Sequence, residues 1–281
     1  MRRTIRTLIS TAALLAILVP TSACAFLQQL LGNIQYPVVK VTQMVPELKD
    51  IATAVLHFKL AIKNPNPVGF KLAGIGYGLD VEGKHVADGR TRKGLTLKAN
   101  GKSATAVDVN VKLIEIAASF LELLGKPSAA YAGTFDLEFD TPVGKINIPI
   151  KHSGKFPLPQ KPPIALEGIQ ISGVDFSGVK LLAKVRIDNP NPFRMPVDAL
   201  RMNLKVNNRD LAGVSAPAGL AMEPGQPLRI PLTVNASFGA IGLTAADLTR
   251  RPNLAYKASM NLASGPLKLP ADLAGTFRFA N

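Results

Sequence analysis

The stretches IKNPNPVGFKL (residues 62–72) and IDNPNPFRMPV (residues 187–197) carry the same Asn-Pro-Asn-Pro run, 125 residues apart. Proline has no N–H for a β-ladder and holds the preceding residue in an extended conformation. Each run follows an alternating apolar stretch, so we expect it to end a strand. The asparagine amides are expected to bond nearby backbone groups, and this architectural role is favoured over ligand recognition. The loop residues are Asn64, Pro65, Asn66 and Pro67 in the first copy and Asn189, Pro190, Asn191 and Pro192 in the second.

The repeat extends far beyond these two runs. Val107 matches Leu232 and Tyr131 matches Tyr256 at the same offset, and after a four-residue deletion the register resumes at an offset of 121. Self-similarity over so long a period indicates two copies of a whole domain. Alternation of apolar and polar residues within each copy indicates half-buried strands in antiparallel sheets.

One segment of each copy departs from this alternation. Residues 113–124, LIEIAASFLELL, carry an apolar stripe at helical spacing, and residues 240–248 are a weaker counterpart. The sequence therefore predicts a mainly β chain of two tandem antiparallel β-sandwiches, each with about seven strands and one helix. The expected boundaries are 37–156 for domain 1, 157–165 for a stiff proline-rich linker and 166–281 for domain 2.

The N-terminus has the features of an export signal. Three arginines precede a short apolar run at residues 8–19, which is too short for a comfortable membrane span. Cys24, the only cysteine in the sequence, follows Thr-Ser-Ala in a pattern that resembles the bacterial lipobox, whose cysteine is lipidated. We expect a signal peptide at 1–23, a tether at 24–36 and an outer membrane lipoprotein facing the periplasm. The alternative is cleavage before Phe26, which would give a soluble periplasmic or secreted protein.

The formal net charge of +14 is spread over both copies, which favours a general affinity for anionic surfaces over one deep polyanion groove. Its most uneven part is the segment 84–102, which we interpret as a hairpin that contacts anionic envelope polymers or lipid headgroups. A solvated hairpin is the alternative. Nucleic acid is not expected, because no aromatic residues interleave the charges. The candidate contact residues are Lys84, Arg90, Arg92, Lys93, Lys98 and Lys102.

A search for catalytic or metal-binding patterns finds none. His57, His85 and His152 lack partners at metal-ligand spacing and are interpreted as isolated surface histidines. No nucleophile elbow, P-loop or dinucleotide fingerprint is present. Asp136, Glu138 and Asp140 share one strand face, where a solvated face is favoured over a weak cation patch. The sequence predicts no enzyme, catalytic residue, metal, cofactor or small-molecule substrate.

The strand that ends in Asn-Pro-Asn-Pro, the alternating strand after it, the Gly or Asn turn and the following "VADG" or "LAGV" are similar to one known domain. They resemble the late embryogenesis abundant type 2 family, whose module is also called the water stress and hypersensitive response (WHy) domain. The resemblance covers both copies. It implies two tandem fibronectin-III-like or immunoglobulin-like antiparallel β-sandwiches, each with one helix. It also implies an association with desiccation and other stress, and no established catalytic activity.

Two functions are compatible with these observations. The first is a non-catalytic, exported and lipid-anchored stress protectant that contacts destabilised client proteins or envelope surfaces through fixed faces or sheet edges. The second is a cell-envelope binding or assembly subunit with a specific polymer or protein ligand. A protectant predicts weak binding to many clients, whereas an envelope subunit predicts saturable and selective binding.

Overall fold

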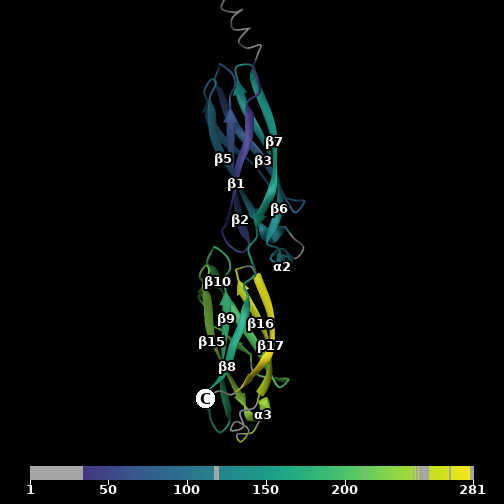
Figure 1. The fold of residues 1–281 in the computed structure, drawn as a ribbon, viewed down its shortest axis with the longest axis vertical. Coiled ribbons are helices and arrows are strands. Elements are labelled where there is room, and N and C mark those ends of the chain that lie inside the picture. Colours follow the sequence, from purple (N-terminus) through teal and green to yellow (C-terminus); the bar gives the residue numbers. More distant parts are fainter. Residues whose placement is uncertain are drawn as a thin grey trace, which may run out of the picture.

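The computed structural model describes residues 34–116, 120–211, 213–242, 244, 246, 253–265 and 267–278. The expected signal peptide, the lipidation site Cys24 and the tether up to residue 33 lie outside the described residues. The described residues form two β-sandwiches stacked end to end along the long axis of the molecule (Figure 1). Among them, no helix is long and apolar enough to cross a membrane.

Domain 1 is built from two antiparallel sheets, whose strand orders are β1-β2-β5 and β4-β3-β6-β7. The predicted alternation explains why each sheet has one buried face. In β2, for example, every second residue is buried and the residues between are more exposed. The strands are β1 (Val38–Leu48), β2 (Thr53–Lys63), β3 (Phe70–Val81), β4 (Lys84–Leu97), β5 (Lys102–Lys112), β6 (Ser128–Thr141) and β7 (Gly144–Pro157).

Domain 2 repeats this plan with more interruptions. Its sheet β15-β9-β8 corresponds to β5-β2-β1, and its larger sheet has the order β12-β11-β16-β17, with β13 also paired to β11 and with β10 and β14 forming a separate pair. The elements are β8 (Ile164–Val174), β9 (Gly178–Asp188), β10 (Met195–Val197), β11 (Ala199–Val206), β12 (Arg209–Asp210), β13 (Val214–Ser215), β14 (Leu220–Met222), β15 (Pro227–Ser237), β16 (Asn253–Ser264) and β17 (Leu267–Arg278).

The core of domain 1 lies between its two sheets and is centred on aromatic rings. Phe58 of β2 is fully buried, and its ring centroid lies 4.9 Å from that of Phe135 and 5.6 Å from that of Tyr131, both on β6. These edge-to-face contacts add to the apolar area that the rings bury. In domain 2 the position of Phe58 is taken by Ala183, which is also fully buried.

The turns after β3 and β11 confirm the expected positive φ at Gly83 and Asn208. In the first turn Glu82 and Gly83 have φ of 50° and 76°, and in the second Asn207 and Asn208 have 49° and 64°. Two consecutive positive φ values match the right-handed twist of the flanking strands, which is why such turns close two-residue hairpins.

The structure shows less helix than the sequence predicts. Within the expected helix of residues 113–124 it describes a 3-10 turn, η1 (Leu113–Glu115), and a four-residue helix, α2 (Phe120–Leu123), while residues 117–119 lie outside the description. In domain 2, α3 (Phe238–Ile241) begins earlier than expected, because the Ser237 hydroxyl accepts a hydrogen bond from the Ala240 N–H as an N-cap. Most of residues 243–252 are not described.

The two domains meet where the β1–β2 loop of domain 1 faces the asparagine loop of domain 2. Ile51 in that β1–β2 loop is only 4% exposed, and it lines a mostly apolar pocket of about 370 Å³ together with Phe193 and Met195. Beside it, the Gln160 Nε2 of the linker donates to the Lys126 carbonyl at 3.2 Å. The junction therefore covers the asparagine-loop end of domain 2, whereas domain 1 contributes its opposite end (Figure 1).

Candidate functional site

The asparagine loop of domain 1 uses its side-chain amides inside the fold. Asn64 is fully buried, and its Nδ2 donates to the carbonyls of Val68 at 2.8 Å and Lys98 at 3.1 Å. Its Oδ1 accepts from both the backbone N–H and the Nδ2 of Asn66, at 3.0 and 2.9 Å. As the sequence predicts, the amides replace ladder partners that the prolines cannot provide.

Domain 2 reproduces these bonds at the equivalent positions. Asn189 Nδ2 donates to the carbonyls of Phe193 at 2.8 Å and Met222 at 3.0 Å, and its Oδ1 accepts from the Asn191 N–H at 3.0 Å. Asn189 and Asn191 are 2% and 3% exposed. The loops of both domains are therefore structural in the same way.

The second asparagine of each loop clamps the segment that enters its domain. Asn66 donates from Nδ2 to the Gln35 carbonyl at 2.8 Å and accepts the Gln35 N–H at 2.7 Å, so one amide pairs with one peptide group. Asn191 makes the same pair with Gln160, at 2.9 and 2.7 Å. Sequence analysis missed this clamp, although Gln35 and Gln160 are separated by the same 125-residue offset.

The basic segment 84–102 is not the single hairpin that the sequence predicts. Its first part is β4, which lies at one edge of the sheet β4-β3-β6-β7, and its last residue, Lys102, begins β5 in the other sheet. The connection between the sheets bonds to the asparagine loop, because the Asn64 N–H donates to the Gly101 carbonyl at 2.9 Å and the Asn100 N–H to the Asn66 carbonyl at 2.8 Å. The loop thus fixes the position of Lys98 and Lys102.

Arg90 differs from the other candidate contact residues because it already has a partner. It forms an ion pair with Glu138 on β6, and the same carboxylate accepts from Lys145 Nζ at 2.9 Å. The Arg90 side chain passes over Gly74 on the strand between them, where a Cβ would be in ordinary contact with Arg90 Nε at 3.5 Å. The Arg90 side chain is therefore bound to a carboxylate on the outer face of its own sheet.

The remaining candidate cations reach solvent. Lys84, Arg92, Lys98 and Lys102 are exposed, and within the described part of the chain none of them forms an ion pair. The side chain of Lys93 lies outside the description. These four side chains are available to an external anion. Because they are exposed, salt should weaken their attraction to that anion.

The carboxylates Asp136, Glu138 and Asp140 lie on β6 and share its outer face, as alternation requires. Arg90 and Lys145 pair with Glu138, so cations of the same domain compensate part of the negative charge on this face. In the described residues, no group of three or more His, Cys, Asp and Glu side chains is arranged to hold a metal ion.

The interpretation of the histidines as isolated is wrong. His57 bridges two strands, with Nδ1 2.8 Å from Asp108 Oδ1 on β5 and Nε2 3.1 Å from Glu47 Oε2 on β1. His85 lies between Asp80 and Asp88, and His152 Nδ1 lies 2.9 Å from the Tyr131 hydroxyl. Sequence spacing could not show these contacts, because antiparallel pairing brings together residues that are far apart in the chain.

The contacts of His57 and His85 with carboxylates change the pKa of these two imidazoles. Hydrogen bonds from His57 to Asp108, and then to Glu47, raise the pKa of His57 above its ordinary value. Hydrogen bonds to Asp80, and then to Asp88, raise the pKa of His85 in the same way. Both imidazoles therefore hold a proton more strongly in the folded chain than in the unfolded chain.

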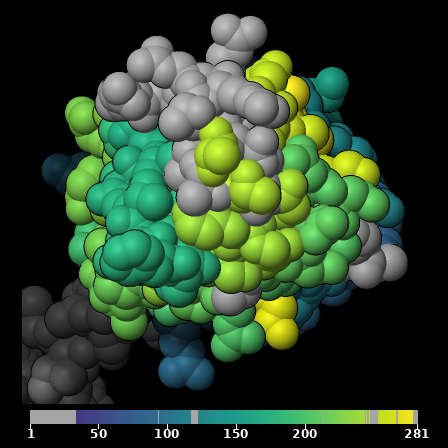
Figure 2. Space-filling view, turned by 90° about the horizontal axis from the view of Figure 1, so that it is seen from below, coloured from purple at the N-terminus to yellow at the C-terminus, as the bar shows by residue number. Residues whose placement is uncertain are grey.

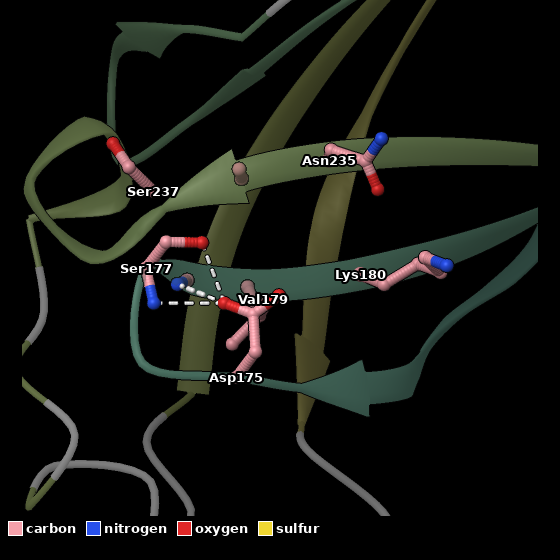
Figure 3. Close-up of a pocket in the computed structure, with 8 residues that line it drawn as sticks. Asp175, Ser177, Val179, Lys180, Asn235 and Ser237 are labelled. Atoms are coloured by element: carbon pink, nitrogen blue, oxygen red, sulfur yellow. Dashed lines mark hydrogen bonds between the residues drawn. The ribbon is translucent and has the colours of Figure 1, made fainter.

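The far end of domain 2, which Figure 2 shows end-on, carries a pocket of about 470 Å³ (Figure 3). It lies where the β8–β9 loop meets the end of β15, and Asp175 and Ser177 line it. Asp175 accepts from the Ser177 hydroxyl and from the N–H groups of Ser177 and Gly178, so its carboxylate serves the turn (Figure 3). These bonds, led by the Ser177 hydroxyl, lower the pKa of Asp175.

Comparison with known proteins finds a matching family model and several similar solved structures. No curated protein matches it. Among solved structures, a putative late embryogenesis abundant (LEA) protein is 28% identical, over 50% of this chain and 80% of that one, with a TM-score of 0.35. A protein from Arabidopsis thaliana is 23% identical, over 46% of this chain and 85% of that one, with a TM-score of 0.39. A protein from Archaeoglobus fulgidus is 12% identical, over 44% and 96% of the two chains, with a TM-score of 0.32.

The family model described as late embryogenesis abundant protein matches residues 59–154 and residues 184–276. The first region extends from β2 to β7 and the second from β9 to β17, so each match falls within one sandwich and includes its asparagine loop. The chain therefore belongs to the late embryogenesis abundant LEA_2 family and carries two copies of its domain.

Proposed function

We propose that this chain is an exported, lipid-anchored protein that protects other macromolecules during stress such as desiccation, without catalysis. The observation that carries the proposal is the family match over both copies, since a stress-related and non-catalytic role is consistent with LEA_2 membership. Lipidation of Cys24 would hold the two WHy-type sandwiches at the outer membrane, facing the periplasm. The clients would be destabilised proteins or envelope surfaces.

The folded architecture supports protection through fixed faces. The buried amides of both asparagine loops, the Asp175 carboxylate and the Arg90–Glu138 pair are satisfied within the fold. What the described chain offers outward is two rigid sandwiches with exposed cations and sheet edges such as β4. Sheet edges and charged faces are surfaces that reversible partners use.

A drying assay tests the proposal. A labile enzyme is dried and rehydrated with this protein, and separately with an equal mass of an inert basic β-sandwich protein. We expect clearly greater recovery of enzyme activity with this protein, because protection depends on its particular surfaces. Equal recovery with both proteins would reject direct protection.

The second candidate is an envelope binding or assembly subunit, and the unpaired cations near β4 favour it. It differs from a protectant in predicting saturable binding to one envelope component. A titration of the protein against isolated envelope fractions would separate the two, since a protectant gives weak, unsaturated binding to many fractions.

A further inference from the structure

The asparagine-loop end of domain 1, where Gln35 is clamped to Asn66, carries a hollow on the outer face of the sheet β1-β2-β5. The hollow has a volume of about 380 Å³, and its apolar wall includes Val38 and Ala61. Lys40, Lys63 and Lys102, one from each strand, also line it. Strand register explains this gathering, because Lys63 pairs with both Val38 and Lys102, and Lys40 pairs with Ala61.

The lysines of this hollow have no internal partner. Lys40, Lys63 and Lys102 are exposed, and in the described part of the molecule none forms an ion pair. Lys98 adds a fourth exposed cation at the same end, on the connection that the Asn64 amide holds. Like charges gathered without counter-ions repel one another, so the arrangement favours an external anion.

Exposed apolar side chains accompany these lysines. Tyr36 is 70% exposed and Val38 is 49% exposed, and they follow Gln35 within three residues at the start of the described chain. An aromatic ring with a hydroxyl and a small apolar side chain, next to lysines, is the composition that interfacial membrane-binding surfaces use. Soluble polyanions would need the lysines but not the exposed ring.

The equivalent end of domain 2 has the opposite character. At the 125-residue offset, Lys40, Lys63, Lys98 and Lys102 correspond to Ala165, Asp188, Glu223 and Pro227. Domain 1 meets this end at Phe193 and Met195, whereas Ala165, Glu223 and Pro227 remain exposed. The shared scaffold therefore does not require the lysines, which are found only in the first copy.

We propose that this lysine end (Tyr36, Val38, Lys40, Lys63, Lys98 and Lys102) docks on the anionic headgroups of a lipid bilayer. The lysines contact headgroup phosphates, while Tyr36 and Val38 enter the interfacial layer. The inference deepens the proposed function, on which it rests, by naming the membrane surface as a partner and this end as the site. It needs no lipid on Cys24.

The test is a vesicle-binding titration of the full chain. Vesicles of phosphatidylcholine alone and of phosphatidylcholine with about one third phosphatidylglycerol are compared at low and physiological salt. The test variant is Lys40→Gln, Lys63→Gln, Lys102→Gln. The matched control is Lys184→Gln, Lys257→Gln, Lys268→Gln in domain 2, which removes the same charge from three exposed lysines and keeps the same N-terminus.

Each lysine near an anionic membrane strengthens binding about fivefold, so the test variant should bind anionic vesicles about 100-fold more weakly than the wild type. The control should change by less than about fivefold, because its lysines do not face the membrane. A Tyr36→Ser, Val38→Ser variant should lose affinity that persists at high salt, since that part is apolar. Equal losses in test and control variants, or no loss in either, would overturn the proposal.

Two further measurements separate the outcomes. Glycerol phosphate and soluble anionic polymer are used as competitors, and binding of either as tight as binding to vesicles would replace the bilayer by a soluble anion and reject the proposal. The drying assay is repeated with the test variant in the absence of lipid. If the test variant still protects the enzyme but no longer binds vesicles, both proposals are supported. If the wild type binds vesicles but does not protect the enzyme, the proposed function is rejected and the docking surface remains.

Discussion

The two asparagine-loop ends of the molecule share one scaffold but have opposite surfaces. In both loops the first asparagine makes equivalent buried hydrogen bonds, and the second clamps the entering chain. Around the loop of domain 1 lie four exposed lysines, whereas the corresponding positions of domain 2 include Asp188 and Glu223, which pair with Arg186 and Arg194. The difference teaches that the motif maintains the architecture, while the charge of the surrounding surface can change without affecting it.

The edge strand differs between the copies for a local reason. In domain 1, β4 is continuous from Lys84 to Leu97 and pairs with β3 along its length, apart from two register shifts. The corresponding chain of domain 2 forms only the short strands β12, β13 and β14. Pro217 lies in this region and has no N–H for a ladder, and Gly213 and Gly219 lower strand propensity. The short strands of domain 2 and the charged side chains on β4 of domain 1 are two different ways to protect a sheet edge from unwanted pairing.

The largest effect is expected for Phe58→Ala, which gives domain 1 the residue that domain 2 has at Ala183. Phe58 is fully buried against Phe135 and Tyr131, so its removal leaves a cavity and should cost about 3–5 kcal/mol of unfolding free energy. Urea unfolding followed by near-UV circular dichroism measures it. A loss below about 1 kcal/mol would mean that the core relaxes around the cavity and that Phe58 is not central.

Substitution of the first asparagine should test whether the two loops are equivalent. Asn64→Ala and Asn189→Ala each remove two buried donors and an acceptor, so each should cost about 2–3 kcal/mol in its own domain. Asn64→Asp keeps the shape and the acceptor but loses the donors, and it should be destabilising as well. Urea unfolding of the three variants checks this, and a negligible effect in one domain alone would break the equivalence.

The two β1–β2-type loops offer a third comparison, between a covered and an uncovered tip. Ile51 is buried at the junction, whereas Phe176, at the same offset in domain 2, is fully exposed. Ile51→Ser should cost about 2 kcal/mol because it removes buried apolar surface. Phe176→Ser should change stability by less than about 0.5 kcal/mol. Thermal unfolding of both variants measures the difference, and equal effects would contradict the junction.

The smallest expected effect is a pH dependence confined to domain 1, because all three histidines lie in the first copy. The folded-state pKa of His57 and His85 is raised, so their stabilising contribution is complete below the ordinary imidazole pKa of about 6.5 and is lost as pH rises through the raised values. Urea unfolding of domain 1 from about pH 6 upward should show this decrease. The double variant His57→Gln, His85→Gln should flatten it, and an unchanged slope would reject the two bridges.

Much of the fold was predictable because it depends on periodicity and repetition. Alternation indicated the antiparallel sheets, and the positions of Gly83 and Asn208 indicated hairpin turns. Helix length was overestimated, since the stripe at residues 113–124 could not show where η1 ends. The candidate site was harder to predict from the sequence, because its contacts join different strands. This holds for the His57 bridge, the Arg90–Glu138 pair and the hollow between Lys40, Lys63 and Lys102. Register, not spacing, creates these neighbours.

The central claim is that the protein protects through folded faces and not as a flexible polar chain. The most direct measurement is the recovery of a dried labile enzyme with wild-type protein and with the double variant Phe58→Ala, Asn189→Ala, which destabilises both domains, after equilibration at a temperature that unfolds the variant but not the wild type. The account predicts high recovery with the wild type and recovery close to that of an inert protein with the unfolded variant. Equal protection by both would contradict it, because an unfolded chain would then be sufficient.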